Sequence, residues 1–188
     1  ITNGFDEDDF VDVKRNELDK FTITYIGILY NTNDINALLS AFSAMKDKEN
    51  CCLRFVGHSG IIASEIEKFN LQAYTEILPH VKHSEAVQLM ADSSVLVLLV
   101  PNKDKASAFL PGKLFEYLAA RRPILGIALP DNEIREIIAT CDAGECFEYN
   151  DTKGMLAFLQ NKKMEWESKR ICEIKNDKYL QFSRRELT

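Results

Sequence analysis

Apolar residues along this chain follow two alternating patterns between positions 21 and 163. Short runs rich in valine, isoleucine and leucine are typical of strands, and stretches with apolar residues three or four positions apart are typical of amphipathic helices. Ser84 is placed to cap the helix over 83–93, and Asn132 lies at the start of the helix over 132–141. The predicted strands are 21–29, 51–57, 74–78, 95–100, 123–129 and 144–149. The predicted helices are 34–45, 61–69, 83–93, 112–120, 132–141 and 152–163.

This alternation predicts an α/β fold with an open, doubly wound, parallel sheet of the Rossmann-like type and helices on both faces. The continuous apolar run Val95–Val100 fits a central strand that is covered on both sides. Ligands of such sheets bind at the carboxyl ends of the strands, near the point where the strand order reverses. The loops after Gly27, Gly57, Leu78 and Val100 are therefore the first candidates for a site.

The two ends of the chain differ in character from its middle. Residues 1–20 are acidic and contain the turn signal Asn3-Gly4, so we interpret them as a linker from a preceding N-terminal domain. Residues 21–163 form the predicted domain. Residues 164–188 are a polar, basic tail in which a helical pattern begins at Ser183 without being completed, which indicates a truncated helix.

The composition of the chain argues against several classes of function but does not identify one. The 188 residues suit one domain with a full-sized core, and a net charge of -6 argues against wholesale binding of nucleic acid. No apolar run is long enough to cross a bilayer. The five cysteines are interpreted as reduced thiols of a cytoplasmic protein, and the three histidines lack the spacing of a zinc site. The acid run at 6–9 is interpreted as solvated rather than metal-binding.

The fourth predicted helix is apolar on nearly every side, yet it carries Lys113 and Glu116 on one face. A buried glutamate needs a partner, because removing its charge from water costs several kcal/mol. Backbone N–H groups around Pro111–Leu114 and the Lys113 ammonium would hold a phosphate, with Gly112 allowing close approach, and Glu116 would accept the hydroxyls of a ribose. Alternatively, Glu116 pairs with Lys113 or Arg121 at the surface and binds no ligand.

The stretch "LPGKLFEYLAARRPILGI" at 110–127 also carries the most specific family motif. It resembles the "P-S/G-K-hydrophobic-x-E-Y-hydrophobic-A" signature of GT-B fold glycosyltransferases of family 4 (group 1) type, in their C-terminal, donor-binding domain. The likeness covers almost the whole chain. Other similar stretches are "ITNGFDEDDF", "TYIGILY", "LRFVGHSG", "ILPHVKHSEAVQLMADSSVLVLLV" and "YLQFSRRELT", the last resembling the start of a helix that crosses back to the other domain.

The resemblance assigns roles to individual residues. Glu116 matches the acid that binds the nucleotide ribose, and the helix start at 111–114 matches the backbone that meets the diphosphate. The loop 79–81 matches the base-binding loop, and the loop from Gly27 to Tyr30 lies where the diphosphate passes the first strand. His58 is either a sugar or phosphate contact or a plain loop residue. Lys113 and Glu116 are the candidate catalytic residues. The predicted donor-binding residues are Gly27, Tyr30, Gly57, His58, Pro79, His80, Val81, Pro111, Gly112, Lys113, Leu114 and Glu116.

The chain departs from the family pattern at three places. Ala108 stands where many relatives have a second glutamate that touches the donor sugar, and Ile28 stands where many have an arginine. Asn31–Asn33 provide no lysine to neutralise a diphosphate. These gaps fit a divergent subgroup that uses backbone amides, and they equally fit a weakened or inactive site. Cations that could supply the missing charge are Lys103, Lys105 and Lys113.

The resemblance implies a hexosyltransferase-type enzyme that moves a sugar from a UDP- or GDP-sugar to a hydroxyl acceptor, in surface polysaccharide or glycan synthesis. It implies no metal or other cofactor, no nucleic acid partner, and an N-terminal acceptor domain without which this fragment is inactive. Two alternatives stay open: a sugar-nucleotide epimerase of the same architecture, and a non-catalytic nucleotide-binding or scaffold domain derived from such an enzyme. The expected location is the cytoplasm, with peripheral association at the inner face of the membrane as a further option.

Overall fold

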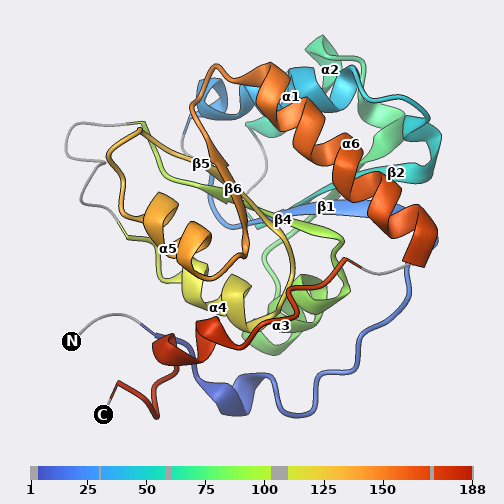
Figure 1. Ribbon diagram of the computed structural model, residues 1–188. Coiled ribbons are helices and arrows are strands. Elements are labelled where there is room, and N and C mark those ends of the chain that lie inside the picture. Colours follow the sequence, from blue (N-terminus) through green and yellow to red (C-terminus); the bar gives the residue numbers. More distant parts are fainter. Residues whose placement is uncertain (1–3, 30, 58–60, 103–109, 170–171, 188) are drawn as a thin grey trace.

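Six parallel strands form one open sheet in the computed structural model, which describes residues 4–29, 31–57, 61–102, 110–169 and 172–187 (Figure 1). The strand order is β3-β2-β1-β4-β5-β6, so the order reverses between β1 and β4. This arrangement confirms the predicted doubly wound sheet. The strands are β1 Phe21–Ile26, β2 Cys51–Val56, β3 Thr75–Leu78, β4 Val95–Leu99, β5 Ile124–Ile127 and β6 Gly144–Phe147.

Helices cover both faces of this sheet (Figure 1). One core lies between the sheet and α1, α2 and α6, and the second lies between the sheet and α3, α4 and α5. Strands β1, β2, β4, β5 and β6 contribute to both cores because successive side chains point to opposite faces, whereas β3 contributes only Leu78, to the second core. No helix of the described residues is long and apolar enough to span a membrane. The helices are α1 Asn36–Ser43, α2 Ile62–Lys68, α3 His83–Asp92, α4 Lys113–Ala119, α5 Ile134–Thr140 and α6 Thr152–Lys169.

Most element boundaries differ from the prediction by one or two residues, and the two largest differences have identifiable reasons. Strand β1 ends at Ile26 rather than at residue 29, since Gly27 adopts a φ of 138° and turns the chain out of the sheet. Helix α6 continues to Lys169 rather than ending at 163, because Trp166 packs edge-on against Phe21 with 6.1 Å between ring centroids. Tertiary packing therefore extends the last helix beyond its amphipathic pattern.

The predictions for Ser84 and Asn132 at two helix starts have different outcomes. Helix α3 begins at His83 after Lys82 in an extended conformation, with no side-chain cap, so the predicted capping role of Ser84 is wrong. In α5 the Asn132 side-chain oxygen accepts a hydrogen bond from the N–H of Ile134 at 3.0 Å, which confirms Asn132 at the helix start. An asparagine oxygen satisfies one of the N–H groups that a helix leaves unpaired at its beginning.

The acidic N-terminal end and the basic C-terminal end of the chain lie against each other. The roles of the first as a linker and of the second as the start of a crossover helix stay predictions. Phe5 is buried and forms a parallel bridge with Ser183. The Asp6 carboxylate pairs with Arg184 at 2.9 Å, so the acid run at 6–9 is only partly the solvated stretch expected. Residues 184–187 form a turn. The C-terminal segment in turn contacts α4, where the Phe182 ring packs against the Phe115 ring with 5.3 Å between centroids and a tilt of 53°.

None of the five cysteines forms a disulfide in the structure. Cys51, Cys141 and Cys172 are buried, and Cys52 and Cys146 are partly buried. Burial raises the pKa of Cys51, Cys146 and Cys172 to about 11 in each case. The thiols of these three residues are therefore protonated and weakly nucleophilic at neutral pH.

Candidate functional site

A pocket of about 790 Å³ lies at the carboxyl ends of β1, β2 and β4, beside the start of α4. The loops after β1, β2, β3 and β4 all contribute to its wall, as expected from the sequence. The pocket lies where the strand order reverses, which is the usual ligand position in an open parallel sheet. Its described lining includes Gly27, Ile28, Asn31, Asp34, Gly57, His80, Val81, Lys82, His83, Pro101, Pro111, Lys113 and Tyr117.

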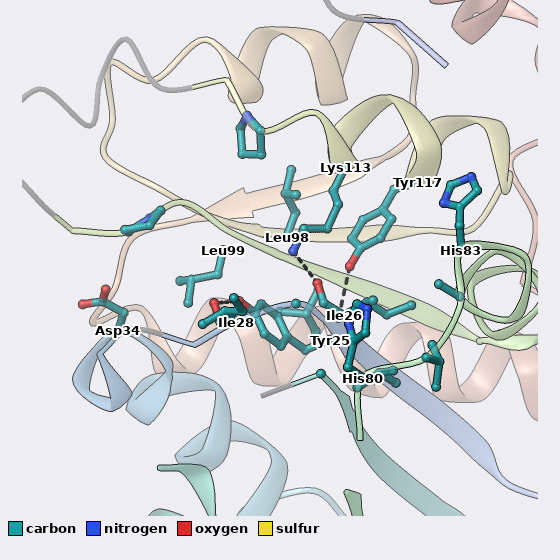
Figure 2. Close-up of a pocket in the computed structure, with 18 of the residues that line it drawn as sticks. Tyr25, Ile26, Ile28, Asp34, His80, His83, Leu98, Leu99, Lys113 and Tyr117 are labelled. Atoms are coloured by element: carbon teal, nitrogen blue, oxygen red, sulfur yellow. Dashed lines mark hydrogen bonds between the residues drawn. The ribbon is translucent and has the colours of Figure 1, made fainter. Parts of the chain in front are cut away.

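Helix α4 completes the hydrogen bonding of the last residue of β1. Pairing between β1 and β4 ends at Tyr25 and Val97, so Ile26 extends beyond the ladder. The Tyr117 hydroxyl accepts a hydrogen bond from the Ile26 N–H at 3.3 Å, and the Lys113 ammonium donates to the Ile26 carbonyl at 2.5 Å (Figure 2). Both side chains of α4 are therefore fixed at the switch point of the sheet.

Lys113 brings a positive charge into the pocket, and no carboxylate of the described residues forms an ion pair with it. Burial lowers the pKa of its ammonium, opposed by the charge of Glu116. The Lys113 nitrogen lies 5.5 Å from the centroid of the Tyr25 ring, a cation–π distance. Within the described part of the chain, Lys113 forms no ion pair. A desolvated cation without a counter-ion beside an open pocket is suited to binding an anion.

Two glycines allow the backbone and Lys113 to approach closely at the floor of the pocket. A Cβ atom at Gly57 would lie 2.7 Å from the carbonyl oxygen of Gly27, and a Cβ atom at Gly27 would lie 1.9 Å from the Lys113 nitrogen. Both glycines also have positive φ angles, 122° and 138°, which other residues rarely adopt. The floor is therefore formed by backbone and the Lys113 side chain.

Glu116 is partly buried on α4, one position before Tyr117. Among the described residues it forms no ion pair and no side-chain hydrogen bond, so the alternative of a surface pair with Lys113 or Arg121 is wrong. Arg121 lies near Glu173 instead, at 3.8 Å. Burial raises the pKa of Glu116. Smaller effects on this pKa come from the charges of His83, Asp9, Lys113 and Arg184.

His83 connects the rim of the pocket with the N-terminal segment. It is the first residue of α3, as in the predicted helix 83–93, and it lines the pocket. Its Nε2 atom lies 2.9 Å from the Asp9 carboxylate, and this hydrogen bond raises the pKa of His83. The imidazole is thus biased toward its charged form beside the pocket.

The model of the family described as "Glycosyl transferases group 1" matches residues 20–161, which include all six strands, α4 and the pocket-lining residues given above. The chain belongs to this family. A comparison with curated protein sequences gave no match.

Solved structures of other glycosyltransferases share the fold. HepE from Anabaena in complex with UDP-glucose superposes with a TM-score of 0.71 at 14% identity, over 97% of this chain and 52% of HepE. WaaG, a glycosyltransferase involved in lipopolysaccharide biosynthesis, gives a TM-score of 0.63 at 14% identity, over 86% of this chain and 45% of WaaG. The catalytic domain of cholesterol-α-glucosyltransferase from Helicobacter pylori gives 0.58 at 18% identity, over 80% of this chain and 89% of that domain. The chain spans about half the length of HepE and WaaG.

The structure of this glycosyl transferase domain brings half of the predicted donor-binding residues to the pocket wall. Pro79, Gly112, Leu114 and Glu116 are not part of that wall. Tyr30 and His58 lie outside the described residues, as do Ala108, Lys103 and Lys105. The predicted residues that line the pocket are Gly27, Gly57, His80, Val81, Pro111 and Lys113.

The start of α4 offers fewer free N–H groups than the sequence suggests. The Leu114 N–H donates to the Pro111 carbonyl and the Phe115 N–H to the Gly112 carbonyl, each at 3.1 Å. The N–H groups of Gly112 and Lys113 have no acceptor among the described residues. A Cβ atom at Gly112 would meet none of the described residues within 4 Å. No described residue therefore fills the space beside this turn.

Tyr117 and Asp34 line the pocket of the domain without having been predicted from the sequence. Tyr117 follows Lys113 by four positions, so helical spacing places both on one face and could have identified it. Asp34 begins a predicted helix and had no comparable signal. Its burial depends on contacts with Asn31 and Asn102 that only the folded chain creates.

Replacing Tyr117 with phenylalanine is expected to lower the free energy of unfolding by about 2 kcal/mol. The change removes one oxygen and leaves the buried N–H of Ile26 without an acceptor. Urea denaturation of the wild type and of Tyr117→Phe measures the difference. Tyr74→Phe is the matched control, since no hydrogen bond of the Tyr74 hydroxyl is present in the described structure. Equal stability of the two variants would contradict the proposed contribution of this bond.

Proposed function

We propose that this chain is the nucleotide-sugar donor-binding domain of a glycosyltransferase that moves a sugar from a UDP- or GDP-sugar to a hydroxyl acceptor. The observation that carries the proposal is the Lys113 ammonium, which faces a 790 Å³ pocket without a carboxylate partner in the described residues. Family membership supports a sugar-transferring enzyme. HepE, which shares the fold, was solved with UDP and with UDP-glucose.

The proposed binding mode follows the pocket from α3 to α1. The loop that contains His80 and Val81 would hold the base, and Lys113 would contact the diphosphate together with the free N–H groups at the start of α4. Glu116 would accept hydrogen bonds from the ribose hydroxyls. Its carboxylate has no protein partner among the described residues and is influenced by the charge of His83, which lines the pocket, although Glu116 itself is not part of the pocket wall.

Catalysis by the complete enzyme would depend on stabilising the leaving diphosphate. As the bond between sugar and phosphate breaks, negative charge grows on the phosphate oxygen, and a preorganised cation in a dry site stabilises that charge. Lys113 is held in place by the Ile26 carbonyl and is therefore positioned for this role. The proposal needs no metal ion. It assigns the acceptor site to a separate N-terminal domain and a place in surface polysaccharide or glycan synthesis to the enzyme.

Isothermal titration calorimetry of the 188-residue chain with UDP and with GDP tests the proposal, with binding of at least one nucleotide as the expected result. Glu116→Ala is expected to weaken that binding about tenfold or more, since charged hydrogen bonds contribute about 1.5–3 kcal/mol each. Glu136→Ala, which removes an exposed glutamate from α5, is the control and should bind like the wild type. Unchanged affinity of Glu116→Ala would make Glu116 structural only.

A non-catalytic scaffold domain is the second candidate, and one observation favours it. Ile28 lines the pocket with 50% of its surface exposed, at the position where many relatives have an arginine. A site that lacks this cation would bind a diphosphate less tightly. Absence of heat from both UDP and GDP at millimolar concentration, with a folded sample, would support the scaffold and contradict the proposed enzyme.

A further inference from the structure

Asp34 is the only carboxylate among the described residues that line the pocket. It lies in the short 3-10 turn Thr32–Ile35 that leads into α1, and only 5% of its surface is exposed. One carboxylate oxygen accepts a hydrogen bond from the Asn102 N–H at 3.1 Å, and the other accepts from the Asn31 side chain at 3.2 Å. No cation of the described residues forms an ion pair with it.

Asp34 lies at the end of the pocket opposite to the predicted base-binding loop. Figure 2 shows Asp34 on one side and His80 and His83 on the other, with Lys113 between them. The two ends belong to different faces of the sheet, because Asp34 leads into α1 while His83 begins α3. A ligand that fills the pocket from His83 to Asp34 therefore crosses the carboxyl edge of the sheet and passes Lys113 midway.

The Asp34 end of the pocket differs in charge from the middle of the pocket, where Lys113 lies. A carboxylate has about four lone-pair sites, and the two hydrogen bonds of Asp34 leave capacity for donors on a ligand. A second anion next to a buried, unpaired carboxylate is unfavourable, because like charges repel strongly where water is excluded. The group bound at this end should therefore be uncharged and should offer hydroxyl donors.

We infer that Asp34 is a specificity-determining residue that binds hydroxyls of a neutral donor sugar and disfavours donors whose sugar carries a carboxylate. The inference rests on the proposed nucleotide-sugar function. With the base at the loop 79–81 and the diphosphate at Lys113, the sugar of a linear nucleotide-sugar extends to the Asp34 end. Rejection of uronic acid donors would then follow from charge repulsion at a single residue.

Calorimetry with UDP, UDP-glucose and UDP-glucuronic acid tests this inference. The two sugars differ in one carboxylate, so their contrast isolates the effect of charge. The wild-type chain is expected to bind UDP-glucose about tenfold more tightly than UDP-glucuronic acid. Asp34→Asn should reduce this preference to about twofold and weaken UDP-glucose binding about tenfold, while UDP alone changes by less than about threefold. If only GDP binds, GDP-mannose and GDP-mannuronic acid provide the same contrast.

The controls separate the possible failures. Asp19→Asn removes an exposed carboxylate just before β1, at the opposite end of the strands, and should keep the wild-type preference. Equal wild-type affinity for the neutral and acidic donors overturns the inference without any variant, so folding of Asp34→Asn is not decisive. An unchanged preference in Asp34→Asn also overturns it. Absence of binding by UDP and GDP in the wild type overturns the proposed function itself, and the inference with it.

Discussion

Replacing Lys113 with methionine is expected to weaken UDP or GDP binding by about 100-fold. Methionine keeps a long, unbranched side chain while removing the charge that would face the diphosphate. The ammonium is already desolvated and held by the Ile26 carbonyl, so little reorganisation accompanies phosphate binding. Stability should change by less than about 1 kcal/mol, because the lost hydrogen bond is offset by removal of a buried, unpaired charge.

Calorimetry on folded Lys113→Met measures this effect. Lys153→Met is the matched control, since Lys153 is exposed on α6, on the other face of the sheet from α4. This control should bind nucleotide like the wild type. A loss of less than about threefold in Lys113→Met would place the phosphate elsewhere and remove the main support for the proposed function.

The Lys113 ammonium also determines how nucleotide affinity is expected to depend on pH. Burial lowers the pKa of Lys113 from its usual 10.5, so the free protein loses this charge at a lower pH than an ordinary lysine would. Nucleotide binding favours the charged form. Affinity should therefore be highest below the lowered pKa and should fall as the pH rises through it. Lys113→Met should lack this fall.

Replacing Gly57 with alanine is expected to lower the free energy of unfolding by about 3 kcal/mol. The added Cβ atom would lie 2.7 Å from the carbonyl oxygen of Gly27, which is backbone and cannot rotate away. A φ of 122° adds strain that glycine does not experience. The loops after β1 and β2 must separate to relieve the contact, so nucleotide affinity should fall together with stability.

Gly112→Ala is the matched control for this effect. Gly112 has a φ of -55° and an added Cβ atom would meet none of the described residues within 4 Å, so alanine should leave stability unchanged or slightly higher. Urea denaturation of both variants checks the contrast. A destabilisation of similar size in the two variants would show that the close approach of Gly57 to Gly27 is not its cause.

Much of the fold could be predicted from local pattern alone. The order of strands and helices follows from the spacing of apolar residues in each segment. Because α4 is apolar on nearly every side, the sequence correctly predicts that Leu114, Phe115 and Leu118 are buried. The position of the pocket could also be predicted from the sequence, because parallel strands place all their carboxyl ends at one edge of the sheet. Errors were confined to element ends, where Gly27 shortens β1 and Trp166 lengthens α6.

The candidate site was predicted less completely, because its hydrogen bonds join residues far apart in the sequence. The Lys113 ammonium meets the Ile26 carbonyl only because α4 packs where β1 extends beyond β4. Asp34 is buried because the loop after β4 returns to it through Asn102.

Three features could be predicted from the amino-acid sequence: the doubly wound sheet, the edge at which a ligand would bind, and the buried helix that carries Lys113 and Glu116. These features depend on periodicity and on residue type, which are local properties of the chain. Three further features required the folded structure. Lys113 has no carboxylate partner among the described residues, Tyr117 accepts a hydrogen bond from the last residue of β1, and Asp34 lines the far end of the pocket. The reason is that distances between loops depend on how the sheet twists and how both layers of helices pack.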